Sequence, residues 1–99
     1  QYILRSAVSA TKPGGMIVYS TCTLSPEENE KVIDWLLDKE PGVVEIEAVN
    51  LPLAGLQVGL SGWGKDEFAP AIRQTLRVIP SEVMEGFYIA KLRKLKSNV

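Results

Sequence analysis

The stretch that decides the fold is residues 12–37, KPGGMIVYSTCTLSPEENEKVIDWLL. A proline and two glycines at 13–15 end a helical pattern that begins near Tyr2, because proline lacks an amide proton and glycine adopts turn conformations. The apolar run at 16–19 that follows is continuous, which is typical of a strand covered on both faces in a parallel sheet. We therefore expect a helix that ends near Lys12 and a buried strand directly after it.

The second half of this stretch carries the signals of a helix start. Ser25 is a candidate N-cap, Pro26 suits the first helical position, and Glu28 completes a capping box with the serine. Apolar residues at helical spacing then predict one buried face, formed by Val32, Ile33, Leu36 and Leu37. The Pro41-Gly42 pair predicts the end of this helix.

Further along the chain the sequence predicts a strand at 43–49, a long loop at 50–71, a short extended segment at 75–79 and a last strand at 87–92. This order of elements indicates an α/β fold with at least two parallel strands joined by a right-handed crossover. Because three strands are few for a doubly wound sheet, we interpret residues 1–99 as the carboxyl-terminal half of a larger domain.

Composition excludes several classes of protein. The 99 residues are 45% hydrophobic and 23% charged, which fits a globular unit and not a collagen, a disordered chain or a membrane-spanning protein. The net charge of −1 gives no general attraction to nucleic acid. One cysteine and no histidine exclude an internal disulfide, a Cys–His protease site and a zinc site built from this chain alone. We also find no signal peptide pattern and expect a reducing compartment.

Cys22 directly follows the predicted buried strand, at the end of the sheet where doubly wound proteins bind ligands. One interpretation is a thiolate nucleophile held between that strand and the following helix. The other is a small apolar filler, because free cysteines are among the most buried residues. Residue patterns alone leave both interpretations open.

Four segments together carry a family resemblance. YSTCT at 19–23 and SPEENE at 25–30, followed by TLRVIP at 75–80 and EGFYIAKLRK at 85–94, resemble the carboxyl-terminal part of the Sun-type RNA 5-methylcytosine methyltransferases. The resemblance implies the carboxyl-terminal half of a doubly wound, Rossmann-like class I methyltransferase sheet. It also implies that the final strand is antiparallel and lies between the strand that precedes Cys22 and the next one along the chain.

The resemblance assigns roles to particular residues. It implies that Cys22 attacks carbon 6 of a cytosine in tRNA or rRNA, so that carbon 5 can accept a methyl group from S-adenosylmethionine. Thr21, Thr23 and Arg77 are the candidate substrate-binding residues, although both threonine hydroxyls could equally cap local backbone. The family's cofactor-binding strands lie upstream of this segment, so we expect no cofactor-binding residue here and little catalysis by these 99 residues alone. We further expect RNA as partner, no metal or membrane, and a cytoplasmic location, or a nucleolar one in a eukaryote; the oligomeric state stays open.

Two other functions remain possible from the sequence: a catalytically silent module that binds RNA or protein, and a fragment of a small-molecule methyltransferase. Basic residues near the carboxyl end could contact RNA phosphates, although such runs are more often solvated surface: Arg93, Lys94 and Lys96. Trp63 and Phe68 could stack on a base, but we favour a role in which they anchor the long loop to the core. Trp35 we interpret as a packing residue.

Overall fold

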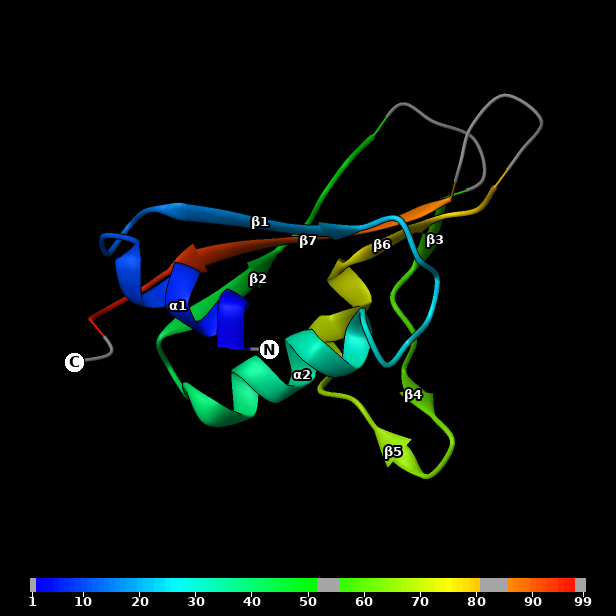
Figure 1. Ribbon diagram of the computed structural model, residues 1–99, viewed down its shortest axis with the longest axis horizontal. Coiled ribbons are helices and arrows are strands. Elements are labelled where there is room, and N and C mark those ends of the chain that lie inside the picture. Colours follow the sequence, from blue (N-terminus) through cyan, green and yellow to red (C-terminus); the bar gives the residue numbers. More distant parts are fainter. Residues whose placement is uncertain (1, 52–55, 81–85, 98–99) are drawn as a thin grey trace.

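The computed structural model describes residues 2–51, 56–80 and 86–97, which form an antiparallel sheet with helices packed against it (Figure 1). The principal elements are α1 (Tyr2–Ala10), β1 (Met16–Thr21), α2 (Glu30–Lys39), β2 (Val44–Glu47), β6 (Leu76–Val78) and β7 (Phe87–Lys94). The predicted strands and helices therefore exist, and most of their bounds agree within a few residues. The continuous apolar run at 16–19 forms a strand, and the amphipathic stretch at 32–37 forms a helix, as predicted.

β7 is the central strand of the sheet. It pairs antiparallel with β1 along one side, where Thr21 faces Tyr88, and with β2 on the other side, where Ile46 faces Leu92. Because both neighbours are antiparallel to β7, β1 and β2 run parallel to each other with β7 between them. This arrangement confirms the position predicted for the final strand.

The stretch at 50–71 is not the structureless loop that the sequence predicts. It contains β3 (Leu56–Val58) and the short hairpin β4 (Gly62–Trp63) and β5 (Asp66–Glu67), and it leads into the 3₁₀ helix η1 (Pro70–Gln74). β3 pairs antiparallel with β6, which is the extended segment predicted at 75–79. The prediction of a loop was wrong because the glycines here mark tight turns, such as Gly64 with φ +61 between β4 and β5. Residues 52–55 of the stretch lie outside the described residues.

The core lies on one face of the sheet. Figure 1 shows α1 and α2 on the same side of β1, β2 and β7. The buried residues of the core come from both helices and from alternate positions of the strands: Leu4, Val8, Ile17, Val32, Ile33, Leu36, Ile46, Tyr88, Ala90 and Leu92. On the opposite face Val18 is 64% exposed. The expectation that residues 16–19 are covered on both faces was therefore wrong for the described chain, in which only one face of β1 is packed.

The helix after Cys22 begins later than its capping box predicts. α2 starts at Glu30, and the residues before it form a turn in which the amides of Glu28 and Asn29 donate to the carbonyls of Ser25 and Pro26. Asn29 occupies the N-cap position, but its side chain makes no capping hydrogen bond. The predicted N-cap at Ser25 was wrong because this segment forms a loop whose polar groups bond to one another.

The basic side chains at the end of β7 form ion pairs and hydrogen bonds within the chain. Arg93 forms an ion pair with Glu47 and donates to the Gly14 carbonyl at 3.0 Å. The hydrogen bond from Arg93 holds the pKa of Glu47 below its usual value, so the contribution of this pair is present at neutral pH and is lost as the pH falls through that lowered pKa. Lys94 is buried, and its Nζ donates to the Val8 carbonyl at 2.6 Å. RNA contact by Arg93 and Lys94 is therefore not supported, whereas Lys96 is exposed.

Replacing Lys94 with methionine should destabilise the fold by about 1–2 kcal/mol, because the last turn of α1 loses a charge-assisted hydrogen bond and a favourable cation at its negative end. The methionine keeps most of the buried volume. Urea unfolding measures the change, with the exposed Lys96→Met as the control. Equal midpoints for the two variants would contradict the capping role.

Candidate functional site

Cys22 lies where the sequence predicts it, directly after the carboxyl end of β1. Its side chain is exposed. An exposed thiol fills no part of the core, so the interpretation of Cys22 as an apolar filler was wrong. The position is instead one at which a thiol can meet an incoming molecule.

Two open hollows adjoin Cys22. One, of about 540 Å³, is bounded by Tyr19 and Thr21 on β1 and by Glu27 and Glu28. The other, of about 560 Å³, is bounded by Leu24, Pro80 and Gly86. Cys22 and Thr23 line both hollows, so the thiol lies at the boundary between them.

Thr21 and Thr23, the two threonines predicted to bind substrate, form hydrogen bonds within the loop that carries Cys22. The Thr21 hydroxyl lies within hydrogen-bond distance of the Thr23 carbonyl and of Asn29 Oδ1. Asn29 Nδ2 donates to the same Thr23 carbonyl at 2.8 Å, and Thr23 Oγ1 accepts from the Ser25 amide at 3.2 Å. These contacts agree with a role of the hydroxyls in shaping the loop, and contact between either threonine and a substrate stays a prediction.

Arg77 lies inside the protein. It is 6% exposed, and its Nε and Nη2 donate to the two carboxylate oxygens of Glu30, with Nη2 at 2.6 Å from Oε1. Its remaining donor, Nη1, bonds to the Leu24 carbonyl at 2.8 Å. Every terminal nitrogen of Arg77 thus has a partner within the chain, and this position does not support the predicted contact with RNA.

Sequence reasoning missed the burial of Asn29 and Glu30. Both lie within SPEENE, where polar residues on the first turns of a helix are usually exposed, and the structure buries both completely. Buried polar side chains require hydrogen-bond partners, and here the partners are the loop backbone and Arg77. The sequence did contain one signal, which is the SPEENE motif: it has more polar residues than are needed to cap the start of a helix.

Tyr19 is a further residue beside Cys22 that the sequence did not single out. Its hydroxyl donates to the Glu28 carbonyl at 2.6 Å, and its ring packs edge to face on Tyr88 with centroids 6.5 Å apart. Burial and the nearby Glu28 carboxylate raise the pKa of Tyr19, so the phenol stays protonated at neutral pH and acts as a donor. It connects the end of β1 to the turn before α2.

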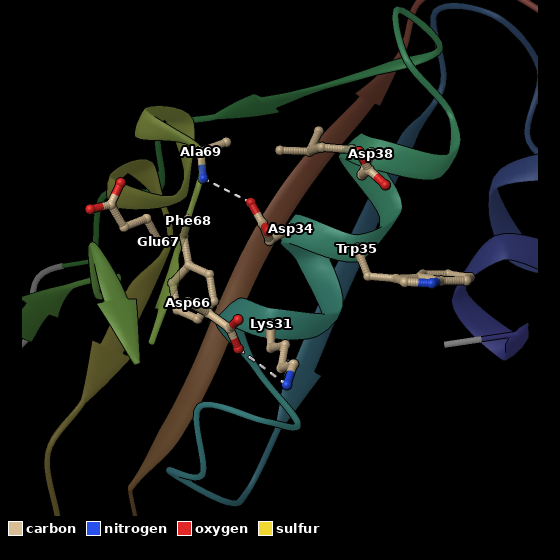
Figure 2. Close-up of a pocket in the computed structure, with 9 residues that line it drawn as sticks. Lys31, Asp34, Trp35, Asp38, Asp66, Glu67, Phe68 and Ala69 are labelled. Atoms are coloured by element: carbon tan, nitrogen blue, oxygen red, sulfur yellow. Dashed lines mark hydrogen bonds and ion pairs between the residues drawn. The ribbon is translucent and has the colours of Figure 1, made fainter. Parts of the chain in front are cut away.

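Another hollow, of about 470 Å³, lies between α2 and the segment from β5 to η1, away from Cys22 (Figure 2). Lys31 pairs with Asp66 at 3.3 Å, and the Ala69 amide donates to Asp34 at 2.8 Å. The acidic side chains that line it are Asp34, Asp38, Asp66 and Glu67. Because this lining repels phosphate, the hollow does not suit RNA.

The aromatic residues of the same region behave differently from one another. Phe68 is 7% exposed and belongs to the core, which confirms its predicted anchoring role. Trp35 packs against the core, also as predicted. Trp63 is 49% exposed on the β4–β5 hairpin, so the expectation that it anchors the chain was wrong.

The described residues offer neither a metal-binding group nor a membrane-spanning helix. Those residues contain no group of three or more side chains able to hold a metal ion. Within the same part of the chain, no helix has both the length and the apolar character needed to cross a membrane.

A central antiparallel strand between two strands that run parallel to each other, with helices packed on one face, is consistent with a fragment of a Rossmann-like methyltransferase. A solved structure described as a methyltransferase homologue from Pyrococcus horikoshii superposes with a TM-score of 0.79 and 39% identity, over 94% of this chain and 29% of that one. Residues 1–93 match the family described as 16S rRNA methyltransferase RsmB/F, and the chain belongs to this family. The match confirms the resemblance found in the sequence.

The similar proteins include enzymes that act on different RNAs. The tRNA (cytosine(49)-C(5))-methyltransferase of Pyrococcus abyssi is 41% identical over 93% of this chain and 29% of its own length. The ribosomal RNA small subunit methyltransferase F of Klebsiella pneumoniae is 43% identical over 93% of this chain and 17% of its own length, and the mouse 28S rRNA (cytosine-C(5))-methyltransferase is 37% identical over 95% and 12%. The chain thus spans less than a third of each of these relatives.

Proposed function

We propose that this chain is the carboxyl-terminal part of the catalytic domain of an RNA cytosine-C5 methyltransferase, in which Cys22 is the nucleophile. The family supports the reaction class, since its similar members are named as methyltransferases of tRNA or rRNA. The observation that carries the assignment of Cys22 is its exposed thiol at the carboxyl end of β1, on the boundary of two open hollows.

In the proposed reaction the Cys22 thiolate is first the nucleophile and later the leaving group. It first forms a bond to carbon 6 of cytosine, and the electron pair of the carbon 5–carbon 6 double bond shifts so that carbon 5 becomes nucleophilic. After carbon 5 has been methylated, its proton leaves to a base, the sulfur–carbon bond breaks, and the double bond re-forms. S-adenosylmethionine, when bound, would supply the methyl group. Covalent catalysis thereby replaces one difficult step by several easier ones.

The described residues do not form a recognisable cradle for S-adenosylmethionine. The glycine pair of this chain turns between α1 and β1, at the end of β1 opposite to Cys22. Gly14 has φ +85, and a side chain at Gly15 would approach Thr11 Cγ2 to 2.6 Å, so the tight turn itself explains both glycines. Ligands of such sheets bind at the opposite, carboxyl ends of the strands. We therefore expect most of the cofactor site on a part of the protein outside these residues.

β1 has an unpaired edge and an exposed apolar face, and both support our inference that the domain extends beyond this chain. Among the described residues only β7 pairs with β1, so its other edge is open, and Val18 and Met16 expose apolar side chains on the outer face. Proteins normally cover such an edge and such a face. We infer that further strands and helices complete the domain there. RNA as the partner, and a cytoplasmic or nucleolar location, belong to the same proposal.

A hybrid enzyme tests the proposed function. In it, the segment of the Pyrococcus abyssi methyltransferase that matches this chain is exchanged for residues 1–93. We expect the hybrid to methylate tRNA and to form a covalent adduct with RNA that contains 5-fluorocytidine, because the fluorine replaces the proton that must leave carbon 5. A folded hybrid that binds S-adenosylmethionine but forms no adduct would contradict the proposal and favour a catalytically silent module.

A further inference from the structure

Each of the two backbone carbonyls that follow Cys22 is held by a buried side chain. The Thr23 carbonyl accepts a hydrogen bond from Asn29 Nδ2, and the Leu24 carbonyl accepts one from Arg77 Nη1, both at 2.8 Å. Asn29 is 0% exposed and Arg77 is 6% exposed. An exposed thiol is thus attached to a loop whose backbone is fixed from the interior of the protein.

Arg77 is itself held in one orientation. Both carboxylate oxygens of Glu30 accept from its guanidinium, and Glu30 also accepts from the Leu60 amide at 2.9 Å. Two parallel hydrogen bonds of this kind fix the plane of a guanidinium as well as its position. Because Arg77 lies on β6 opposite Tyr88 of β7, the Leu24 carbonyl is connected to the centre of the sheet.

We propose that Arg77 and Asn29 are positioning residues, which fix the loop so that the Cys22 sulfur lies where it can attack a bound base. The inference rests on the proposed role of Cys22 as nucleophile. Neither residue is expected to touch the base, because both are buried beneath the loop. Their effect on the reaction is geometric, and a displacement of a reacting group by about 1 Å can lower a rate by about 10²-fold.

Arg93 provides a matched control for Arg77. It also pairs with a glutamate, Glu47, and also donates to a backbone carbonyl, that of Gly14. Gly14 precedes β1, whereas Cys22 follows it, so the Arg93 contacts lie at the other end of the strand. Arg93→Met therefore removes the same kinds of contact without changing the loop that carries Cys22.

Amide hydrogen exchange on this chain tests whether the loop is fixed by these residues. In the double variant Glu30→Leu/Arg77→Met, which leaves no unpaired charge, we expect the exchange of the Ser25 and Glu28 amides to accelerate on the order of tenfold more than that of the β7 amides, whose rates follow only the change in global stability. Asn29→Ala should give the same local change without altering any charge. Unchanged loop exchange, or an equal acceleration of all amides, would overturn the positioning role.

The hybrid enzyme tests whether the fixed loop serves the reaction. In hybrids that still bind S-adenosylmethionine, we expect Arg77→Met/Glu30→Leu and Asn29→Ala to slow adduct formation at least about tenfold. The KM for RNA should stay near its original value, and Arg93→Met should change neither quantity. Adduct formation at the original rate in both loop variants would overturn the inference.

The two proposals fail in different ways. If Cys22 is not the nucleophile, the hybrid with the original sequence forms no adduct that depends on Cys22, although loop exchange still responds to Arg77. If Arg77 and Asn29 do not position Cys22, the original hybrid forms the adduct and the loop variants form it at the same rate. Partial recovery of the adduct rate by Arg77→Lys, with Glu30 retained, would further support positioning, because lysine keeps the charge but has no planar fork.

Discussion

Replacing Cys22 with alanine should abolish both adduct formation and methyl transfer in the hybrid enzyme, with a loss of about 10³-fold or more in kcat. The proposed reaction has no alternative route to an electron-rich carbon 5 once the thiolate is removed, because cytosine alone is a poor nucleophile at that atom. Cys22 is exposed, so the substitution opens no cavity in the core and should leave stability nearly unchanged. Initial rates with radiolabelled S-adenosylmethionine and tRNA measure the loss.

Cys22→Ser is the matched control for this prediction. Serine preserves the size and polarity of the side chain, but its hydroxyl is not ionised at neutral pH, so we expect the same loss of adduct. Tritium-labelled S-adenosylmethionine should still bind to both variants with unchanged affinity. Residual methylation of tRNA by Cys22→Ala at a tenth of the original rate or more would show that another group begins the reaction.

The order of strands could be predicted, but only with the family resemblance. The continuous apolar run of β1 and the pattern of β7 predicted two strands, and the resemblance predicted that β7 lies between β1 and β2. Periodicity alone gives no neighbour order, because pairing partners such as Ile17 and Leu92 are far apart in sequence. Periodicity also could not show that Val18 is exposed. The apolar run at 16–19 is the same whether or not a further layer of the protein covers the outer face of the strand.

The loop that carries Cys22 shows why the detail of the site escaped prediction. Ser25, Pro26 and Glu28 satisfy every local rule for a capping box, yet α2 begins at Glu30. Local propensity is a weak preference that tertiary hydrogen bonds readily exceed. Here the competing bonds come from Asn29, whose partner is the Thr23 carbonyl, and from Arg77, which lies 47 residues from Glu30. Only the folded chain brings those groups together.

Glu30→Ala should be among the most destabilising single substitutions in this chain, at about 3–5 kcal/mol, because it leaves the buried guanidinium of Arg77 without its counter-ion. The Glu30 side chain is 0% exposed and that of Arg77 is 7% exposed, so water cannot replace the lost carboxylate without opening the structure. Small domains have thin stability margins, so a loss of this size should leave a large unfolded fraction. The free energy of unfolding in urea, followed by circular dichroism, measures it.

The double variant Glu30→Leu/Arg77→Met separates the cost of an unpaired charge from the value of the pair. Removing both charges should recover most of the stability and leave a deficit of about 1–2 kcal/mol, because the Leu60 amide and the Leu24 carbonyl lose their side-chain partners. Glu47→Ala breaks the more exposed pair with Arg93 and should have a much smaller effect than Glu30→Ala. If Glu30→Ala and the double variant were equally unstable, the pair would act through the bonds it makes to the loop and not through its charge. A recovered double variant means instead that most of the loss in Glu30→Ala comes from the unpaired guanidinium of Arg77, so that the pair itself adds little net stability and its contacts to the loop are its main contribution.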